Sequence, residues 1–162
     1  MSHILIKGIL DEDFVNYKVP SMFISTNTCT FKCDYENGGH YCQNSELVKQ
    51  ESIDIDIDTI IKRYLGNPIT KAIVFGGLEP FDQFVDVYDL IFKLRNDYDC
   101  QDTVVIYTGY DEDEIDGKLN MLLSIPNIVV KYGRFRPDNC PHFDQILGVN
   151  LASDNQYAQQ IS

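Results

Sequence analysis

Three cysteines in one short polar segment constrain this chain more than any other feature. Cys29, Cys33 and Cys42 are separated by three and then by eight residues. Thiolates at such close spacing can reach a single soft metal centre, and sulfur ligands favour zinc, Cu(I) or iron–sulfur clusters. A structural zinc site normally has four protein ligands. An iron–sulfur cluster held by three cysteines instead leaves one iron open to another ligand.

Two other interpretations of this segment stay open. A zinc ion could take His40 as its fourth ligand, because imidazole and thiolates together form tetrahedral zinc sites. The thiols could also be unligated and behave as small buried hydrophobes. Against that second alternative, the pair Gly38-Gly39 and its polar neighbours are typical of a loop and not of a core segment.

The composition predicts a single globular domain that spans residues 1–162. A chain of this length with 44% hydrophobic residues is large enough to bury a core. Its net charge of −12 and its lack of a basic cluster weigh against nucleic acid or an anionic membrane as a partner. The sequence shows no signal peptide or membrane-spanning run, and five cysteines is an odd number. We therefore expect reduced thiols in the cytoplasm.

Short apolar runs and helical periodicities alternate along the chain, with irregular sequence from residue 136 onward. The segment from Ile53 to Asp58 alternates with a period of two. It is interpreted as a solvated edge before a helix, with Asp58 as the N-cap; a metal site formed by its aspartates is the alternative. The expected strands cover residues 4–9 (an edge strand), 21–26, 71–75, 103–107 and 128–131, and the expected helices cover residues 45–50, 59–65, 82–98 and 119–125.

This alternation predicts an α/β fold with a mostly parallel sheet and right-handed crossovers. Ligands of such sheets bind at the carboxyl ends of the strands. Each informative motif falls at such an end. The cysteine segment follows one strand, Gly-Gly-Leu-Glu-Pro follows the next, Thr-Gly-Tyr follows the third, and Lys131 ends the fourth. We therefore expect one shared site at this edge of the sheet.

The residues after the second of these strands have chemistry that suits an ammonium group. Gly76 and Gly77 let the backbone approach a ligand without a Cβ in the way. Their carbonyls and the Glu79 carboxylate can accept hydrogen bonds from the ammonium, and a tight turn is the alternative. Lys131 could meet a carboxylate of the same ligand, and a plain surface lysine is the alternative there.

The cysteine segment resembles the cluster-binding loop of radical S-adenosylmethionine (SAM) enzymes. Cys29-Thr-Phe-Lys-Cys33 fits the first half of their Cys-x-x-x-Cys-x-aromatic-Cys pattern, and Tyr41 is the aromatic residue before Cys42. About six extra residues separate the second and third cysteines. The resemblance implies a [4Fe–4S] cluster on the three cysteines, SAM at the open iron, and a partial (open) β/α barrel. Gly76-Gly77-Leu78-Glu79 then corresponds to the family's Gly-Gly-Glu-Pro motif, which binds the amino group of SAM.

Further motifs resemble the anaerobic ribonucleotide reductase activating proteins, which are glycyl-radical activases within that superfamily. They are Asp13–Tyr17, Ile106–Tyr110, Gly133–Phe135 and Ser153–Gln156. The resemblance implies an oxidoreductase that takes an electron from a donor such as flavodoxin or ferredoxin, cleaves SAM reductively and generates a glycyl radical on the reductase. It predicts these cofactor-binding residues: Tyr41, Gly76, Gly77, Leu78, Glu79, Thr108 and Lys131.

We also expect Gly133–Phe135 and part of the C-terminal tail to hold the glycyl-radical subunit of the reductase, with Arg134 as the main contact. A tail that merely covers the open side of the sheet is the alternative. Two other functions stay open. One is a radical SAM enzyme for another glycyl-radical enzyme or for a small molecule. The other is a non-catalytic metal-binding interaction module.

Overall fold

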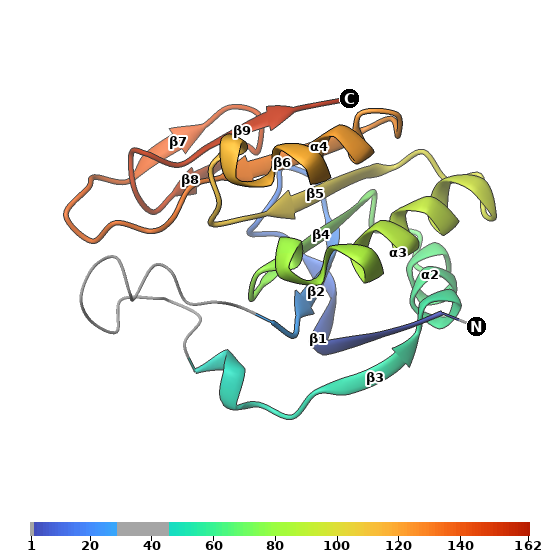
Figure 1. The fold of residues 1–162 in the computed structure, drawn as a ribbon. Coiled ribbons are helices and arrows are strands. Elements are labelled where there is room, and N and C mark those ends of the chain that lie inside the picture. The colour runs from blue at the N-terminus through green and yellow to red at the C-terminus, as the bar shows by residue number, and fades with distance from the viewer. Residues whose placement is uncertain (1, 29–45) are drawn as a thin grey trace.

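The computed structural model describes residues 2–28 and 46–162. The predicted cluster ligands Cys29, Cys33 and Cys42, together with His40 and Tyr41, lie outside the described residues. Figure 1 shows the helices packed on one face of a twisted sheet, with a small β-hairpin beside it. Within the described ranges, no helix is long and apolar enough to cross a membrane.

Seven strands form the main sheet in the order β3-β1-β2-β4-β5-β6-β9. The four central strands β2, β4, β5 and β6 are parallel, while β1 and β9 pair antiparallel with their neighbours. β3 is antiparallel to β1 and therefore runs in the same direction as the central four. The strands are β1 (His3–Asp13), β2 (Ser21–Thr26), β3 (Ile53–Asp56), β4 (Ala72–Gly77), β5 (Thr103–Tyr107), β6 (Ile128–Tyr132), β7 (His142–Asp144), β8 (Val149–Leu151) and β9 (Tyr157–Gln160).

Within the described residues, three α-helices connect the strands: α2 (Ile57–Leu65), α3 (Phe84–Asn96) and α4 (Asp116–Leu122). The expectation of an α/β fold is confirmed. The strands expected at residues 21–26, 71–75, 103–107 and 128–131 all form, within one or two residues of their expected bounds. The helix expected at residues 82–98 is a 3-10 helix at Pro80–Gln83 followed by α3, and the helix expected at 45–50 is a 3-10 helix at Leu47–Lys49. The helix expected at 119–125 begins and ends three residues earlier, as α4.

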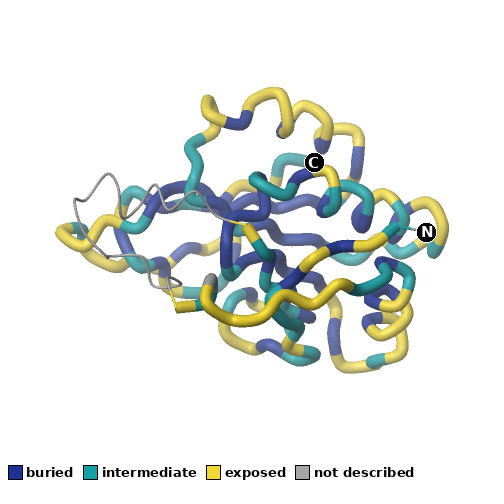
Figure 2. Tube along the Cα trace, turned by 60° about the horizontal axis from the view of Figure 1, so that its bottom comes forward, coloured by how far each residue is buried: buried dark blue, intermediate teal, exposed yellow. Residues whose placement is uncertain are grey.

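The two faces of the sheet bury different residues because successive side chains in a strand point to opposite sides. The helix-facing core includes Ile73, Phe75 and Ile106, packed against apolar residues of all three helices. The other face buries Val74 and Val105 in a smaller cluster that the C-terminal tail helps to cover. Figure 2 shows the central strands dark blue, with the helical turns outside them partly yellow. The near-continuous apolar runs of the central strands reflect this burial on both faces.

The expectation of an edge strand at residues 4–9 is wrong. β1 is longer and lies between β3 and β2, because the alternating segment pairs with it from His3 to Ile6. β3 is the edge, in agreement with the interpretation of that segment as an edge before a helix. Asp56, not Asp58, caps α2: its carboxylate accepts hydrogen bonds from the backbone N–H groups of Asp58 and Thr59. Ile57 is already buried in the helix, which starts two residues earlier than the spacing suggested.

The C-terminal tail is more regular than expected. β7 and β8 form a hairpin, and β9 pairs with β6 at the edge of the main sheet. Leu147, Leu151 and Ala158 join the smaller core cluster. The sequence lacks an apolar pattern here because each of these short strands buries a single apolar side chain, or none. The tail therefore covers the sheet, as the alternative to the docking role predicted.

Candidate cofactor site

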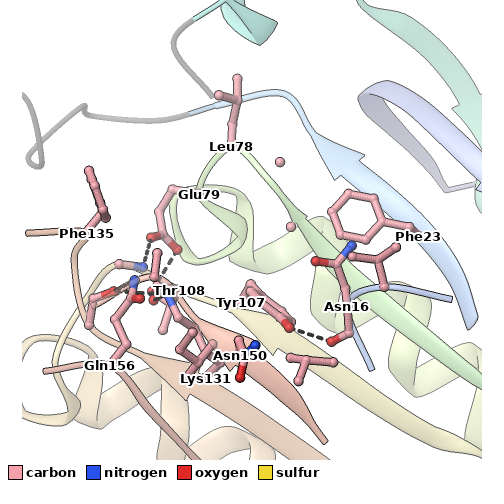
Figure 3. Close-up of a pocket in the computed structure, with 18 residues that line it drawn as sticks. Asn16, Phe23, Leu78, Glu79, Tyr107, Thr108, Lys131, Phe135, Asn150 and Gln156 are labelled. Atoms are coloured by element: carbon pink, nitrogen blue, oxygen red, sulfur yellow. Dashed lines mark hydrogen bonds between the residues drawn. The ribbon is translucent and has the colours of Figure 1, made fainter. Parts of the chain in front are cut away.

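A cavity of about 400 Å³ opens at the carboxyl ends of β4, β5 and β6. Its lining includes the described residues that the sequence assigned to cofactor binding: Gly76, Gly77, Leu78, Glu79, Thr108 and Lys131. Figure 3 shows them around one hollow, with Leu78 and Glu79 above, and Thr108 and Lys131 below. The structure thus brings together residues from three strand ends. Their roles toward a cofactor stay predictions.

The parallel register explains why these residues face the same hollow. Ser25 is opposite Gly76, and Tyr107 is opposite Lys131, so one row of side chains crosses β2, β4, β5 and β6 on the face away from the helices. The missing side chain of Gly76 matters in that row. A Cβ there would lie 2.8 Å from Cζ of Phe23, so a larger residue would have to displace the ring.

Gly77 is required by both its conformation and its neighbours. Its φ of +77° is in the region that favours glycine. A Cβ at this position would lie 2.9 Å from Cβ of Ser25 and 2.9 Å from Cδ2 of Leu47. Gly76 and Gly77, which we call the glycine turn, therefore lie at the cavity wall, where a side chain would not fit.

The residues that flank the cysteine segment on either side contact the turn at Gly76, Gly77 and Glu79. On the N-terminal side, Thr28 accepts a 2.7 Å hydrogen bond from the backbone N–H of Glu79, and the Thr26 hydroxyl donates to the Gly76 carbonyl at 3.2 Å. On the C-terminal side, Leu47 packs against Gly77. The two points where the chain leaves and re-enters the described region thus lie beside the same turn.

Glu79 connects the β4 turn to the β5 turn. Its carboxylate is buried and accepts hydrogen bonds from the Phe81 N–H at 3.0 Å, the Thr108 hydroxyl at 2.9 Å and the Gly109 N–H at 2.8 Å. Burial raises the pKa of Glu79 to about 7, and these three hydrogen bonds oppose the rise. These three hydrogen bonds occupy most of the acceptor capacity of the Glu79 carboxylate. In the structure the carboxylate mainly holds the two turns together, and its expected bond to an ammonium group stays a prediction.

Lys131 is buried, so its alternative interpretation as a plain surface lysine is wrong. Its Nζ donates to the Gly133 carbonyl at 3.0 Å and lies 5.7 Å from the centre of the Tyr107 ring. A buried ammonium that lines a cavity is suited to bind an anion. Thr108 has a different part, because its hydroxyl donates to Glu79 and accepts from the Tyr110 N–H at 3.0 Å.

The sequence did not single out four polar or aromatic residues of the wall: Asn16, Tyr107, Asn150 and Gln156. The Tyr107 hydroxyl donates to the Asn16 carbonyl at 2.5 Å, which ties the segment after β1 to β5. Gln156 donates to the Gly133 carbonyl at 3.2 Å. Asn16, Tyr107 and Gln156 stand inside motifs that carried the family resemblance, and that was the available signal. Asn150 lies in the tail, where no pattern pointed to a site.

Arg134 does not lie on the surface as its expected docking role requires. It is buried, its guanidinium donates to the Glu114 carboxylate at 2.8 Å, and it lies 5.6 Å from the centre of the Tyr110 ring. Changing Arg134 would therefore disturb the protein itself. Outside the cysteine segment, Cys100 is partly buried and Cys140 is exposed.

The donor chemistry of the chain fits an iron–sulfur cluster. In residues 2–28 and 46–162, no group of three or more His, Cys, Asp or Glu side chains could hold a metal ion. Three thiols stand in the intervening segment, and soft thiolates are the ligands that such clusters use. The glycine turn beside the flanks of that segment leaves room for a bound group.

Comparison with known proteins supports a cluster. A comparison with curated proteins found no match. The sequence profile described as "4Fe-4S single cluster domain" matches residues 19–153, which include all three cysteines, the glycine turn and Lys131. Since this region makes up well over half of the chain, the protein belongs to the 4Fe-4S single cluster domain family.

Proposed function

We propose that this protein is a radical SAM activase of the partial-barrel type that generates a glycyl radical on an anaerobic ribonucleotide reductase. One observation carries the proposal. The chain on both sides of the cysteine segment is attached to the Gly76-Gly77 turn, at the wall of a cavity formed by the strand ends. A cluster on the cysteines and a ligand in the cavity would then share one site. The resemblance of the motifs to the activating proteins supplies the choice of reaction.

In this proposal, Cys29, Cys33 and Cys42 would hold the cluster. After reduction by the electron donor, it would supply the one electron needed to cleave SAM to methionine and a 5′-deoxyadenosyl radical. The residues of the cavity bind and orient SAM. The glycine turn lets backbone carbonyls reach the amino group, because no Cβ intervenes. The Lys131 ammonium holds the methionine carboxylate by charge. Glu79 keeps the turns after β4 and β5 at a fixed spacing, and the cavity walls exclude water.

The proposed partners are the glycyl-radical subunit of the reductase and an electron donor such as flavodoxin or ferredoxin. The direct test has two stages. Anaerobically reconstituted and reduced protein should convert SAM to 5′-deoxyadenosine, measured by liquid chromatography. With the reductase subunit present, a glycyl radical should appear in the electron paramagnetic resonance spectrum. An intact cluster that yields no 5′-deoxyadenosine with any reductant would refute the enzyme and favour a metal-binding interaction module.

The cavity also favours a second candidate, a radical SAM enzyme that acts on a small molecule. The region after Lys131 provides material for a substrate pocket, because its residues from Gly133 to Gln156 form much of one wall. Production of 5′-deoxyadenosine without radical formation on the reductase would favour this candidate.

A further inference from the structure

Two adjacent apolar residues stand exposed between β1 and β2. Phe14 is 65% exposed and Val15 is 73% exposed. Single exposed apolar residues are ordinary on protein surfaces. A consecutive pair in a short connection is a more specific feature, because both side chains are offered to solvent at one place. We call residues 14–17 the Phe14–Val15 turn.

The protein holds this turn in a fixed conformation. The buried carboxylate of Asp13 accepts hydrogen bonds from the Val15 N–H at 3.0 Å and from the Asn16 side-chain amide at 2.7 Å. The Tyr107 hydroxyl donates to the Asn16 carbonyl, and Tyr17 is buried in the smaller core cluster. A partner that contacts Phe14 and Val15 would therefore order little additional chain, which lowers the entropic cost of binding.

The turn is also continuous with the cavity. Val15 lines it, and Asn16 lies close to Tyr107 in the wall (Figure 3). A polypeptide segment that enters the cavity beside Val15 would therefore contact this turn. The net charge of −12 makes an anionic membrane or nucleic acid an unsuitable neighbour for it, and this favours a protein as the occupant.

We infer that the Phe14–Val15 turn is the docking site for the protein substrate whose segment enters the cavity. Apolar side chains of that substrate, next to the inserted segment, pack on Phe14 and Val15. This inference rests on the proposed function, and it replaces Arg134 as the main contact because that side chain is buried against Glu114. Aromatic residues at the centre of an interface commonly dominate its binding energy.

The test compares three phenylalanines that lie on different parts of the surface. Phe14→Ser removes the proposed contact. Phe143→Ser removes a side chain of similar exposure, 60%, on the β7–β8 hairpin of the tail, and Phe92→Ser removes one that is 48% exposed on α3. Each reconstituted variant is titrated with the purified glycyl-radical subunit of the reductase by calorimetry, and its 5′-deoxyadenosine production without the subunit is measured separately. Val15→Ser and Val85→Ser form a second pair for the binding experiment, because both valines are 73% exposed.

We expect Phe14→Ser to raise the dissociation constant about tenfold or more, while Phe92→Ser and Phe143→Ser stay near the wild-type value. Production of 5′-deoxyadenosine without the subunit should be unchanged in Phe14→Ser, because this residue is absent from the cavity lining. Val15→Ser should weaken binding and Val85→Ser should not. Equal binding by Phe14→Ser and Phe92→Ser would overturn the inference, as would a loss confined to Phe143→Ser.

Other occupants of the turn give distinct results that also overturn the inference. A wild-type dimer that becomes a monomer in Phe14→Ser would show an interface between two copies of the chain. Binding to phosphatidylcholine–phosphatidylglycerol vesicles that is lost in Phe14→Ser would show a membrane contact. Wild-type protein that cleaves SAM but does not bind the subunit would refute the partner and this docking site, while the SAM chemistry stands. Failure to cleave SAM would refute the proposed function itself.

Discussion

Changing Glu79 to Gln should remove a pH dependence from the stability of this protein. Glu79 is buried between two turns, and burial raises its pKa from 4.5 to about 7. The folded protein therefore binds this proton more tightly than the unfolded chain does. The resulting stabilisation is fully present below pH 4.5 and is lost as the pH rises through about 7. Glutamine has no proton to lose, so the variant lacks this contribution.

The expected size follows from the two pKa values. A difference of one pKa unit corresponds to about 1.4 kcal/mol. Between pH 5 and pH 8, the titration of Glu79 should lower the free energy of unfolding of the wild type by about 2.5 kcal/mol relative to Glu79→Gln. Glutamine also loses a hydrogen bond, because its NH₂ group replaces one carboxylate oxygen and cannot accept from the N–H group that oxygen bonds, either that of Phe81 or that of Gly109. That loss gives an offset between the two proteins that is independent of pH.

Urea unfolding, followed by far-ultraviolet circular dichroism, measures the free energy of unfolding of each protein at several pH values. The wild type and Glu79→Gln are compared at the same iron content. Glu51→Gln is the control, because it makes the same chemical change at an exposed position. The free energy of unfolding of the wild type minus that of Glu79→Gln should fall steadily from pH 5 to pH 8. A constant difference across this range, or one that grows with pH, would refute the argument that burial dominates the ionisation of Glu79.

Three further predictions concern the candidate site. Alanine at Cys29, Cys33 or Cys42 should remove most of the iron bound after reconstitution, as measured by iron and sulfide analysis. The control variant Cys140→Ala should retain its iron, and full iron loading in Cys42→Ala would show that the third ligand is wrong. Gly77→Ala should lower the free energy of unfolding by about 1–3 kcal/mol, because the φ is +77° and the added Cβ would lie 2.9 Å from Cβ of Ser25. Gly8→Ala should not lower it, because a Cβ there meets no atom within 4 Å. Equal urea midpoints of the two variants would contradict this. Lys131→Met should weaken SAM binding about tenfold or more in equilibrium dialysis with the fold retained, and unchanged affinity would exclude its role toward the carboxylate.

The local sequence was sufficient to predict the central part of the fold. The runs at residues 71–75, 103–107 and 128–131 are mostly apolar on both faces, so their burial was readable from composition alone. The run at residues 21–26 has apolar Met22, Phe23 and Ile24 at its centre. Because parallel strands end at one edge of a sheet, the motifs that follow them were expected to meet, and the described ones line one cavity. The spacing of the cysteines predicted a soft metal centre, and the resemblance of their segment to the radical SAM loop implied an iron–sulfur cluster, which the family assignment supports.

Tertiary structure decided the features that depend on contacts between distant residues. The bonds from Glu79 to Thr108 and Gly109, and the pair of Arg134 with Glu114, join segments some 20–30 residues apart. The edge position of β3 and the pairing of β9 with β6 depend on which strand edge remains available for pairing. The alternating pattern of β3 does not identify its partner strand, and β9 has no apolar pattern of its own. Local periodicity reports the burial of a segment and not its partner. The sequence alone therefore determined the core strands and the location of the site, while the packed fold determined which polar groups are buried and which apolar residues, such as Phe14, remain exposed.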